Sequence, residues 1–173
     1  NKNVLNWYPF KKHIPVISLL KNDNDKLWLG TWGNGLIEYN LNDSTYADFA
    51  SVNSLNSDSP LGIMKMVYDQ KKNLLLATNK GLIHFNTLTN NISISEIDTK
   101  NPSALHSINL NDIYIDNSGS IWIATNGAGV SKYDLLKNNF RAYISKVDDK
   151  NSIPPGWVSA IFEFKENELW LKS

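Results

Sequence analysis

The feature of this sequence that most constrains its fold is a segment that recurs at a nearly constant interval. The segment runs from an apolar triplet through a small residue, a Thr and a turn to an aromatic residue followed by Asn or Asp. Three copies begin at Leu27, Leu74 and Ile121, spaced 47 residues apart, and a fourth begins at Leu169, 48 residues later. A steady period of roughly 20–50 residues indicates an array of repeated supersecondary units.

Each repeat is predicted to contain four short strands. The turn inside the recurring segment is typical of a β-hairpin, because Gly and Asn accept the positive φ that tight hairpins need. An apolar run precedes the segment and a weaker strand follows it. The first strands are predicted at 16–20, 64–68, 113–115 and 158–162, and the fourth strands at 46–49, 92–97 and 140–144.

The second strands are apolar on both faces, which predicts burial on both sides. Gly30, Ala77 and Ala124 occupy one aligned position, where a small residue lets backbones approach closely. Trp28 and Trp122 are expected to pack between neighbouring repeats, where they would bury a large area.

A repeat of this length with four strands is typical of a β-propeller. We therefore predict an all-β chain, a β-propeller fragment of four-stranded antiparallel blades. Seven such repeats need roughly 330 residues, so the chain holds about three to four blades of a seven-bladed ring. The blades are predicted at approximately 14–50, 61–98, 108–145 and, incomplete, 157–173, with 4–10 as the outer strand of a preceding blade.

No segment shows helical periodicity, and 51–59 and 146–152 are expected to be polar linkers. Both chain ends are interpreted as cut rather than natural. An incomplete ring leaves unpaired strand edges, which invite pairing with another chain. We therefore expect the chain either to self-associate through its open edges or to be half of a longer ordered domain.

Composition narrows the possible partners. The formal net charge is zero, which argues against a nucleic-acid-binding surface. The chain has no Cys, and therefore no disulfide, thiolate metal site or cysteine nucleophile. No apolar stretch is long enough to span a membrane, and no signal peptide is recognised, so we expect no membrane contact by this segment.

The sequence offers no motif for catalysis, metal binding or a cofactor. The three His residues lack metal-ligand spacing, and a structural or surface role is expected for His84. Asp23 and Asp25 faintly resemble a calcium loop, but its Gly and distal Glu are missing, so a hairpin turn is predicted. The turns at 33–35 and 127–129 lack the Lys and the helix of a phosphate loop. No Glu is placed as a general acid, and no nucleophile elbow is present.

The recurring segment resembles the two-component regulator propeller repeat. The resemblance is carried by 116–134 and 27–40 and, more loosely, by 74–86, where Leu75 replaces the usual Trp and the turn is one residue shorter. The linkers at 53–55, 101–105 and 151–153 resemble the inter-blade Asn-Ser-Leu element of the same family. The last copy departs from the pattern by Lys-Ser in place of Gly-Thr.

This resemblance implies a sensor. Such repeats form the periplasmic part of hybrid two-component histidine kinases of Bacteroides-like bacteria, many of which respond to oligosaccharides. We therefore expect a periplasmic ligand-sensing module that is not itself an enzyme, with an oligosaccharide as its ligand. Two alternatives remain: a protein-interaction scaffold and, less favoured, a carbohydrate-active propeller enzyme.

The candidate binding residues lie in the loops between second and third strands, which line one face of a propeller near its axis. These loops contribute Trp32, Asn34, Asn79, Lys80 and Asn126. An exposed Trp can stack on a sugar ring, while Asn amides bind hydroxyls. Trp32 alternatively packs on its neighbouring loop. The linkers carrying His106 and Trp157 are expected on the same face.

Overall fold

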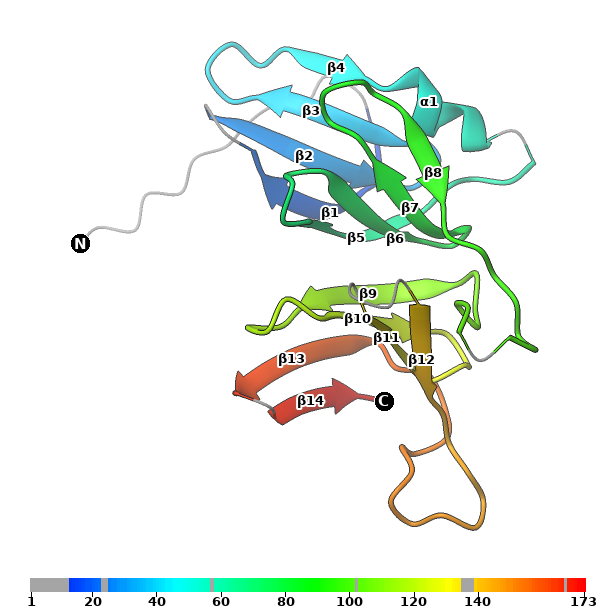
Figure 1. The fold of residues 1–173 in the computed structure, drawn as a ribbon. Helices are drawn as coiled ribbons and strands as arrows, with labels where there is room; N and C mark the ends of the chain where they lie inside the picture. The colour runs from blue at the N-terminus through cyan, green and yellow to red at the C-terminus, as the bar shows by residue number, and fades with distance from the viewer. Residues whose placement is uncertain (1–12, 23–24, 57, 102, 135–138, 167) are drawn as a thin grey trace.

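The computed structural model describes residues 13–22, 25–56, 58–101, 103–134, 139–166 and 168–173 (Figure 1). Within these residues the chain forms four antiparallel sheets, of four, four, four and two strands, that follow one another in chain order. The predicted all-β fold of four-stranded blades is confirmed. The expected outer strand at 4–10 lies outside the described residues.

The strands of each sheet are hydrogen-bonded in chain order. The first sheet consists of β1 (Val16–Lys21), β2 (Lys26–Thr31), β3 (Leu36–Asn40) and β4 (Tyr46–Asp48). The second consists of β5 (Ile63–Tyr68), β6 (Leu74–Thr78), β7 (Gly81–Phe85) and β8 (Ile92–Ile94). The third consists of β9 (Leu110–Ile115), β10 (Ile121–Thr125), β11 (Val130–Asp134) and β12 (Asn139–Tyr143). The last consists of β13 (Ala160–Lys165) and β14 (Glu168–Lys172).

The second strands carry the packing between sheets because their side chains alternate between the two faces. In β2, Trp28 belongs to the core shared with the second sheet, and Leu29 to a separate cluster on the opposite face of the first sheet. Every residue of β6 is buried, which confirms the predicted two-sided burial. Trp122 packs in the same way between the third sheet and the last, as predicted.

The first strands of neighbouring sheets contact one another, so the sheets converge on the side of β1, β5, β9 and β13. The pairing of β1, β5 and β9 with their second strands shifts register once near the beginning of the first strand. Directly after each irregularity comes one aligned residue: Ser18, Lys65 or Asp112. These residues lie opposite Gly30, Ala77 and Ala124.

Each of these aligned residues reaches the next sheet. Ser18 Oγ donates a hydrogen bond of 2.6 Å to Ile63 O. Lys65 Nζ lies 3.8 Å from Asp112 Oδ1, and Asp112 Oδ2 accepts a 2.9 Å hydrogen bond from Ile161 N. The small residues opposite make room for this contact, because a Cβ on Gly30 would lie 2.1 Å from Ser18 Oγ.

One linker departs from its prediction. Residues 51–59 were expected to be a polar linker, but α1 (Ala50–Asn53) and a 3-10 turn (Ser54–Asn56) form at its beginning. Val52 is fully buried against the core between the first two sheets, so tertiary packing fixes this turn. A single helical turn is too short to show a 3.6-residue period in the sequence.

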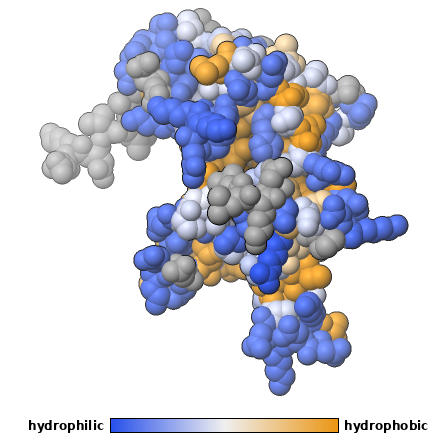
Figure 2. All heavy atoms as spheres, in the orientation of Figure 1, coloured by the Kyte–Doolittle hydropathy of each residue, from blue (hydrophilic) through white to orange (hydrophobic). Residues whose placement is uncertain are grey.

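Each linker also contributes one apolar residue to the packing between sheets. Leu55, Leu105 and Ile153, the last residues of the three Asn-Ser-Leu-like elements, pack into three successive inter-sheet cores. This packing explains why the repeat requires an apolar residue there. The long loop after β12 projects from the body of the molecule, and its visible surface is largely hydrophilic (Figures 1 and 2).

Candidate functional site: the loops between second and third strands

The three hairpin loops that carry the predicted site residues are closed by the same bond. The aligned Thr at the end of each second strand is fully buried, and its hydroxyl donates to a Gly carbonyl across the turn. The three bonds are Thr31 to Gly35 at 2.8 Å, Thr78 to Gly81 at 2.6 Å, and Thr125 to Gly129 at 2.8 Å. The Thr and Gly of the recurring segment therefore fix loop shape.

Gly35 shows why the turn demands glycine. Its φ is +69°, and a Cβ there would lie 1.8 Å from Asn53 Oδ1 in the following linker. Gly129, at the aligned position, has φ +70° and would bring a Cβ to 2.2 Å from Tyr143 O. Both loops are thus clamped against the chain that leads to the next sheet.

Trp32 is 44% exposed, but one face of its ring is occupied. The backbone of Trp32 pairs with Gly62, at the beginning of the second sheet, and a Cβ on Gly62 would lie 2.6 Å from the indole ring. The backbone N–H of Trp32 donates to Pro15 O at 2.9 Å. The residue therefore combines packing on its neighbour with an accessible surface.

Asn79 and Lys80 both form hydrogen bonds with the segment that connects the first sheet to the second. Asn79 Oδ1 accepts a 2.8 Å hydrogen bond from Gly62 N, and its Nδ2 donates to Pro60 O at 3.0 Å. Lys80 Nζ donates to Leu55 O. Their side chains thus hold the linker in place, and Trp32 and Asn79 meet at Gly62.

The two remaining candidates are exposed. Asn34 lines a small hollow of about 180 Å³ together with Asn53 and Asn56 of the following linker. Asn126 lies one sheet further along, and its backbone N–H donates to Asn109 O at 2.9 Å. The structure therefore groups Trp32 with Asn79 around Gly62 and places Asn126 apart from them.

Trp157 precedes the last sheet and is 67% exposed. The next residue, Val158, donates its N–H to Thr125 O, which ties this part of the chain to the β10–β11 hairpin. His106 is partly buried, and its Nδ1 has no hydrogen-bond partner among the described residues. Exposed tryptophans at both ends of the stack thus flank the loop region.

At the other end of the sheets, the turns between first and second strands are stabilised by Asx-type bonds. Asp116 accepts hydrogen bonds from Ser118, Ser120 and, at 2.7 Å, Trp122 Nε1. Burial raises the pKa of Asp116, but these hydrogen bonds outweigh it and leave the pKa below its ordinary value. The aligned turn near Asp25 is closed by Asn22 N donating to Lys26 O, which confirms a hairpin turn.

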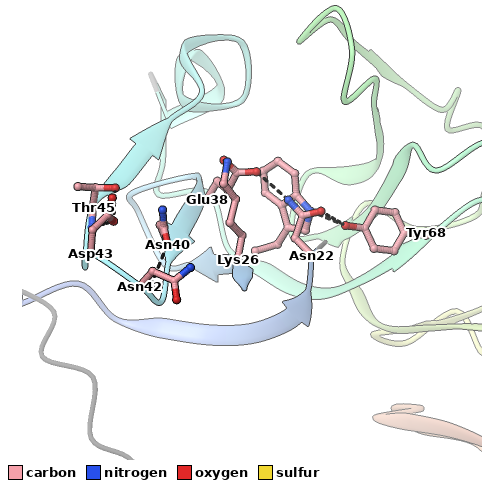
Figure 3. Close-up of polar contacts among 9 residues, drawn as sticks. Asn22, Lys26, Glu38, Asn40, Asn42, Asp43, Thr45 and Tyr68 are labelled. Carbon is pink, nitrogen blue, oxygen red and sulfur yellow. Dashed lines mark hydrogen bonds and ion pairs between the residues drawn. The ribbon is translucent and has the colours of Figure 1, made fainter. Parts of the chain in front are cut away.

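A polar network joins the first sheet to the second beside this turn (Figure 3). Asn22 Nδ2 and Lys26 Nζ donate to the two carboxylate oxygens of Glu38, at 2.7 and 2.8 Å. Tyr68 donates to Asn22 Oδ1 at 2.9 Å and accepts from Trp28 Nε1 at 2.7 Å. Glu38 is therefore held as a paired carboxylate within this network.

The described part of the chain contains no group of three or more His, Asp and Glu side chains able to hold a metal ion. It also contains no helix long and apolar enough to cross a membrane. Sequence reasoning missed a polar hollow between the second and third sheets. Its signal in the sequence is Ser95, which stands in the middle repeat where the first and third repeats have Phe49 and Tyr143.

Sheets of antiparallel strands whose first strands converge define the class: the chain is part of a β-propeller. The family described as two component regulator propeller matches residues 104–127, which confirms the resemblance found in the repeats. No curated protein matches the chain.

Three solved structures share this fold. The extracellular domain assigned to the hybrid two component system BT3049 of B. thetaiotaomicron is 18% identical, with a TM-score of 0.73 over 91% of this chain. The extracellular domain assigned to the one component system BT4673 of that organism is 18% identical, with a TM-score of 0.55 over 95%. A B. thetaiotaomicron protein of unknown function is 13% identical, with a TM-score of 0.65 over 89%.

The chain spans only part of each of these structures: 22% of the first, 28% of the second and 43% of the third. At such identities the likeness shows a common fold.

Proposed function

We propose that the chain is a ligand-sensing propeller module in the extracytoplasmic part of a hybrid two-component sensor histidine kinase. The observation that carries this proposal is the family match at residues 104–127 on a repeat that recurs through the chain. The extracellular sensor domains with the same fold support it. The module would recognise a ligand without catalysis, while a kinase elsewhere in the protein would perform the chemistry.

The ligand we propose is an oligosaccharide bound at the loops between second and third strands. The support is chemical: an indole with an accessible surface at Trp32, and a second exposed indole at Trp157. Aromatic faces stack on the apolar faces of sugar rings, while the exposed amides of Asn34 and Asn126 offer donors and acceptors to hydroxyls. Binding would favour one arrangement of the receptor and so change kinase activity.

Calorimetry on the intact ectodomain with a panel of glycan oligosaccharides tests this proposal. We expect Trp32→Ala to weaken binding about twofold to tenfold, because an aromatic contact is worth roughly 0.5–1.5 kcal/mol. Leu88→Ala is the matched control, because Leu88 is 91% exposed in the turn between β7 and β8. Equal affinity of wild type and Trp32→Ala would remove Trp32 from the site.

The two alternative functions give different results in the same preparation. Glycan turnover that a carboxylate substitution abolishes would identify an enzyme. Binding of a protein partner, without glycan binding, would identify an interaction scaffold.

A further inference from the structure

At two aligned positions, the first and third sheets each hold a pair of aromatic rings in contact, tilted against each other. One position lies in the second strand. The other directly follows the fourth-strand residue that pairs with Ile37 in the first sheet and with Ser131 in the third. In the first sheet the ring centroids of Trp28 and Phe49 lie 5.3 Å apart. In the third sheet those of Trp122 and Tyr143 lie 5.6 Å apart. Each ring pair packs in the core shared with the next sheet, and we call it the aromatic wall of its sheet.

The middle sheet lacks this wall. Strand register places Leu75 at the first position, opposite His84, as Trp28 lies opposite Glu38. It places Ser95 at the second position, because Ile94 pairs with Ile83 in the same way that Asp48 pairs with Ile37. Two large rings are thus replaced by an aliphatic side chain and a hydroxyl.

A hollow of about 450 Å³ lies beside Ser95, between the outer strands of the second and third sheets. Its volume is in the range of small-molecule binding sites, roughly 300–1,000 Å³. The lining is mainly polar. Its apolar part consists of Ile94, Ala104 and the aromatic pair Tyr133 and Phe140, whose ring centroids lie 4.8 Å apart. The polar lining residues are His84, Ser93, Ser95, Glu96, Asn101 and Ser103.

The polar groups can both donate and accept hydrogen bonds. His84 Nε2 lies 2.9 Å from Ser95 Oγ. The two groups form one hydrogen bond, and the tautomer of the imidazole decides which of them is the donor. Burial lowers the pKa of His84, against the opposing charge of Asp69, and therefore favours the neutral ring. A neutral imidazole presents one donor and one acceptor, and each Ser hydroxyl does both.

At the aligned positions in the neighbouring sheets the chemistry is different. Glu38 is paired with the ammonium of Lys26 at 2.8 Å. Lys132 Nζ lies 4.8 Å from the centroid of the Trp122 ring. In both places a charged group is already matched by its own sheet, whereas the middle sheet places hydroxyls and an imidazole beside an open space.

We propose that this hollow binds a neutral polyhydroxylated molecule of about monosaccharide size. Its hydroxyl groups match the mixed donors and acceptors of Ser93, Ser95 and His84, and one apolar ring face matches the Tyr133–Phe140 pair. The proposal is independent of the loop site at Trp32, because the hollow lies against the outer strands of the sheets.

The test is a titration of the ¹⁵N-labelled chain with D-glucose, D-galactose and sorbitol, followed by amide chemical shifts. We expect saturable shifts at 93–96, 101 and 103–105 with at least one of the three. Ser95→Phe should abolish them, because it restores the ring found as Phe49 in the first sheet and fills the hollow. Ser95→Ala should weaken binding about threefold to tenfold, through loss of one hydrogen bond.

Asn42→Ala is the control, since Asn42 is exposed and lies in the turn between β3 and β4 (Figure 3). Absence of saturable shifts with all three probes overturns the proposal, as does unchanged affinity in Ser95→Ala, the variant that decides if Ser95→Phe does not fold. Shifts that centre on Trp32 would overturn it too and assign the ligand to the loop face. Loss of oligosaccharide binding in Trp32→Ala, by contrast, concerns only the loop site.

Discussion

Gly30 lies where the first two sheets approach each other so closely that a Cβ would not fit. Its absent Cβ would lie 2.1 Å from Ser18 Oγ and 2.8 Å from Ile63 O. We predict that Gly30→Ala destabilises the chain by about 1–3 kcal/mol, since overpacking forces these groups apart. Ala77→Gly, at the aligned position, should cost about 1–2 kcal/mol, from backbone entropy and the loss of one buried methyl group. Urea unfolding measures both, and a stabilising Gly30→Ala would contradict the packing assigned here.

His84 should make stability depend on pH. Burial places its folded pKa below the usual value of about 6.5, so the folded chain binds fewer protons than the unfolded chain. Its contribution is complete above pH 6.5 and is lost as pH falls from there toward the folded pKa. We expect urea midpoints to fall on acidification through this window, and His84→Gln to flatten the profile. His13→Gln, at an exposed position, should leave it unchanged.

At the scale of elements, the contact between first strands depends on one buried carboxylate. Asp112 accepts from Ile161 N, whereas its partner Lys65 lies 3.8 Å away with a half-exposed side chain. We predict that Asp112→Ala costs about 1–3 kcal/mol, because a buried N–H loses its acceptor. Lys65→Ala should cost less than about 1 kcal/mol, as solvent-accessible pairs do. Similar losses in both variants, measured by urea unfolding, would assign the contact to charge instead.

Strand pairing was predictable because it depends on local patterns. The Thr and Gly of each hairpin and the two-sided apolar second strands are visible in the sequence, and they fix loops and sheet order. The use of Asn79 and Lys80 was not predictable, because their partners Gly62, Pro60 and Leu55 lie on a linker whose path is set by tertiary packing. The same linker contains α1, a single helical turn that is too short to show a 3.6-residue period in the sequence.

At the scale of the whole molecule, the sheet stack has two different open faces. Leu19 is 62% exposed on β1, although the aligned Met66, Ile113 and Ile161 of the following sheets are 1%, 1% and 6% exposed. In those sheets the side chain packs against the preceding sheet. The exposed surface around Leu19 therefore corresponds to the surface that packs against a preceding sheet elsewhere in the stack.

The opposite face is apolar as well. On the last sheet, Phe162, Phe164 and Trp170 are 60%, 57% and 59% exposed, and the rings of Phe164 and Trp170 stack with centroids 5.1 Å apart. In the other sheets this face packs against the sheet that follows. The two open faces are thus the two halves of one repeated contact, which either a second copy of the chain, head to tail, or further sheets of a longer domain can supply.

We predict that the chain self-associates through these faces, because each contact would remove exposed apolar surface from water. Sedimentation velocity over a wide concentration range should show species heavier than the monomer, and Leu19→Asp should shift the equilibrium toward monomer by placing a charge in the contact. Leu88→Asp changes a leucine that is 91% exposed in the turn between β7 and β8 and should leave association unchanged. A wild-type chain that stays monomeric at every concentration would show that these faces do not recognise each other.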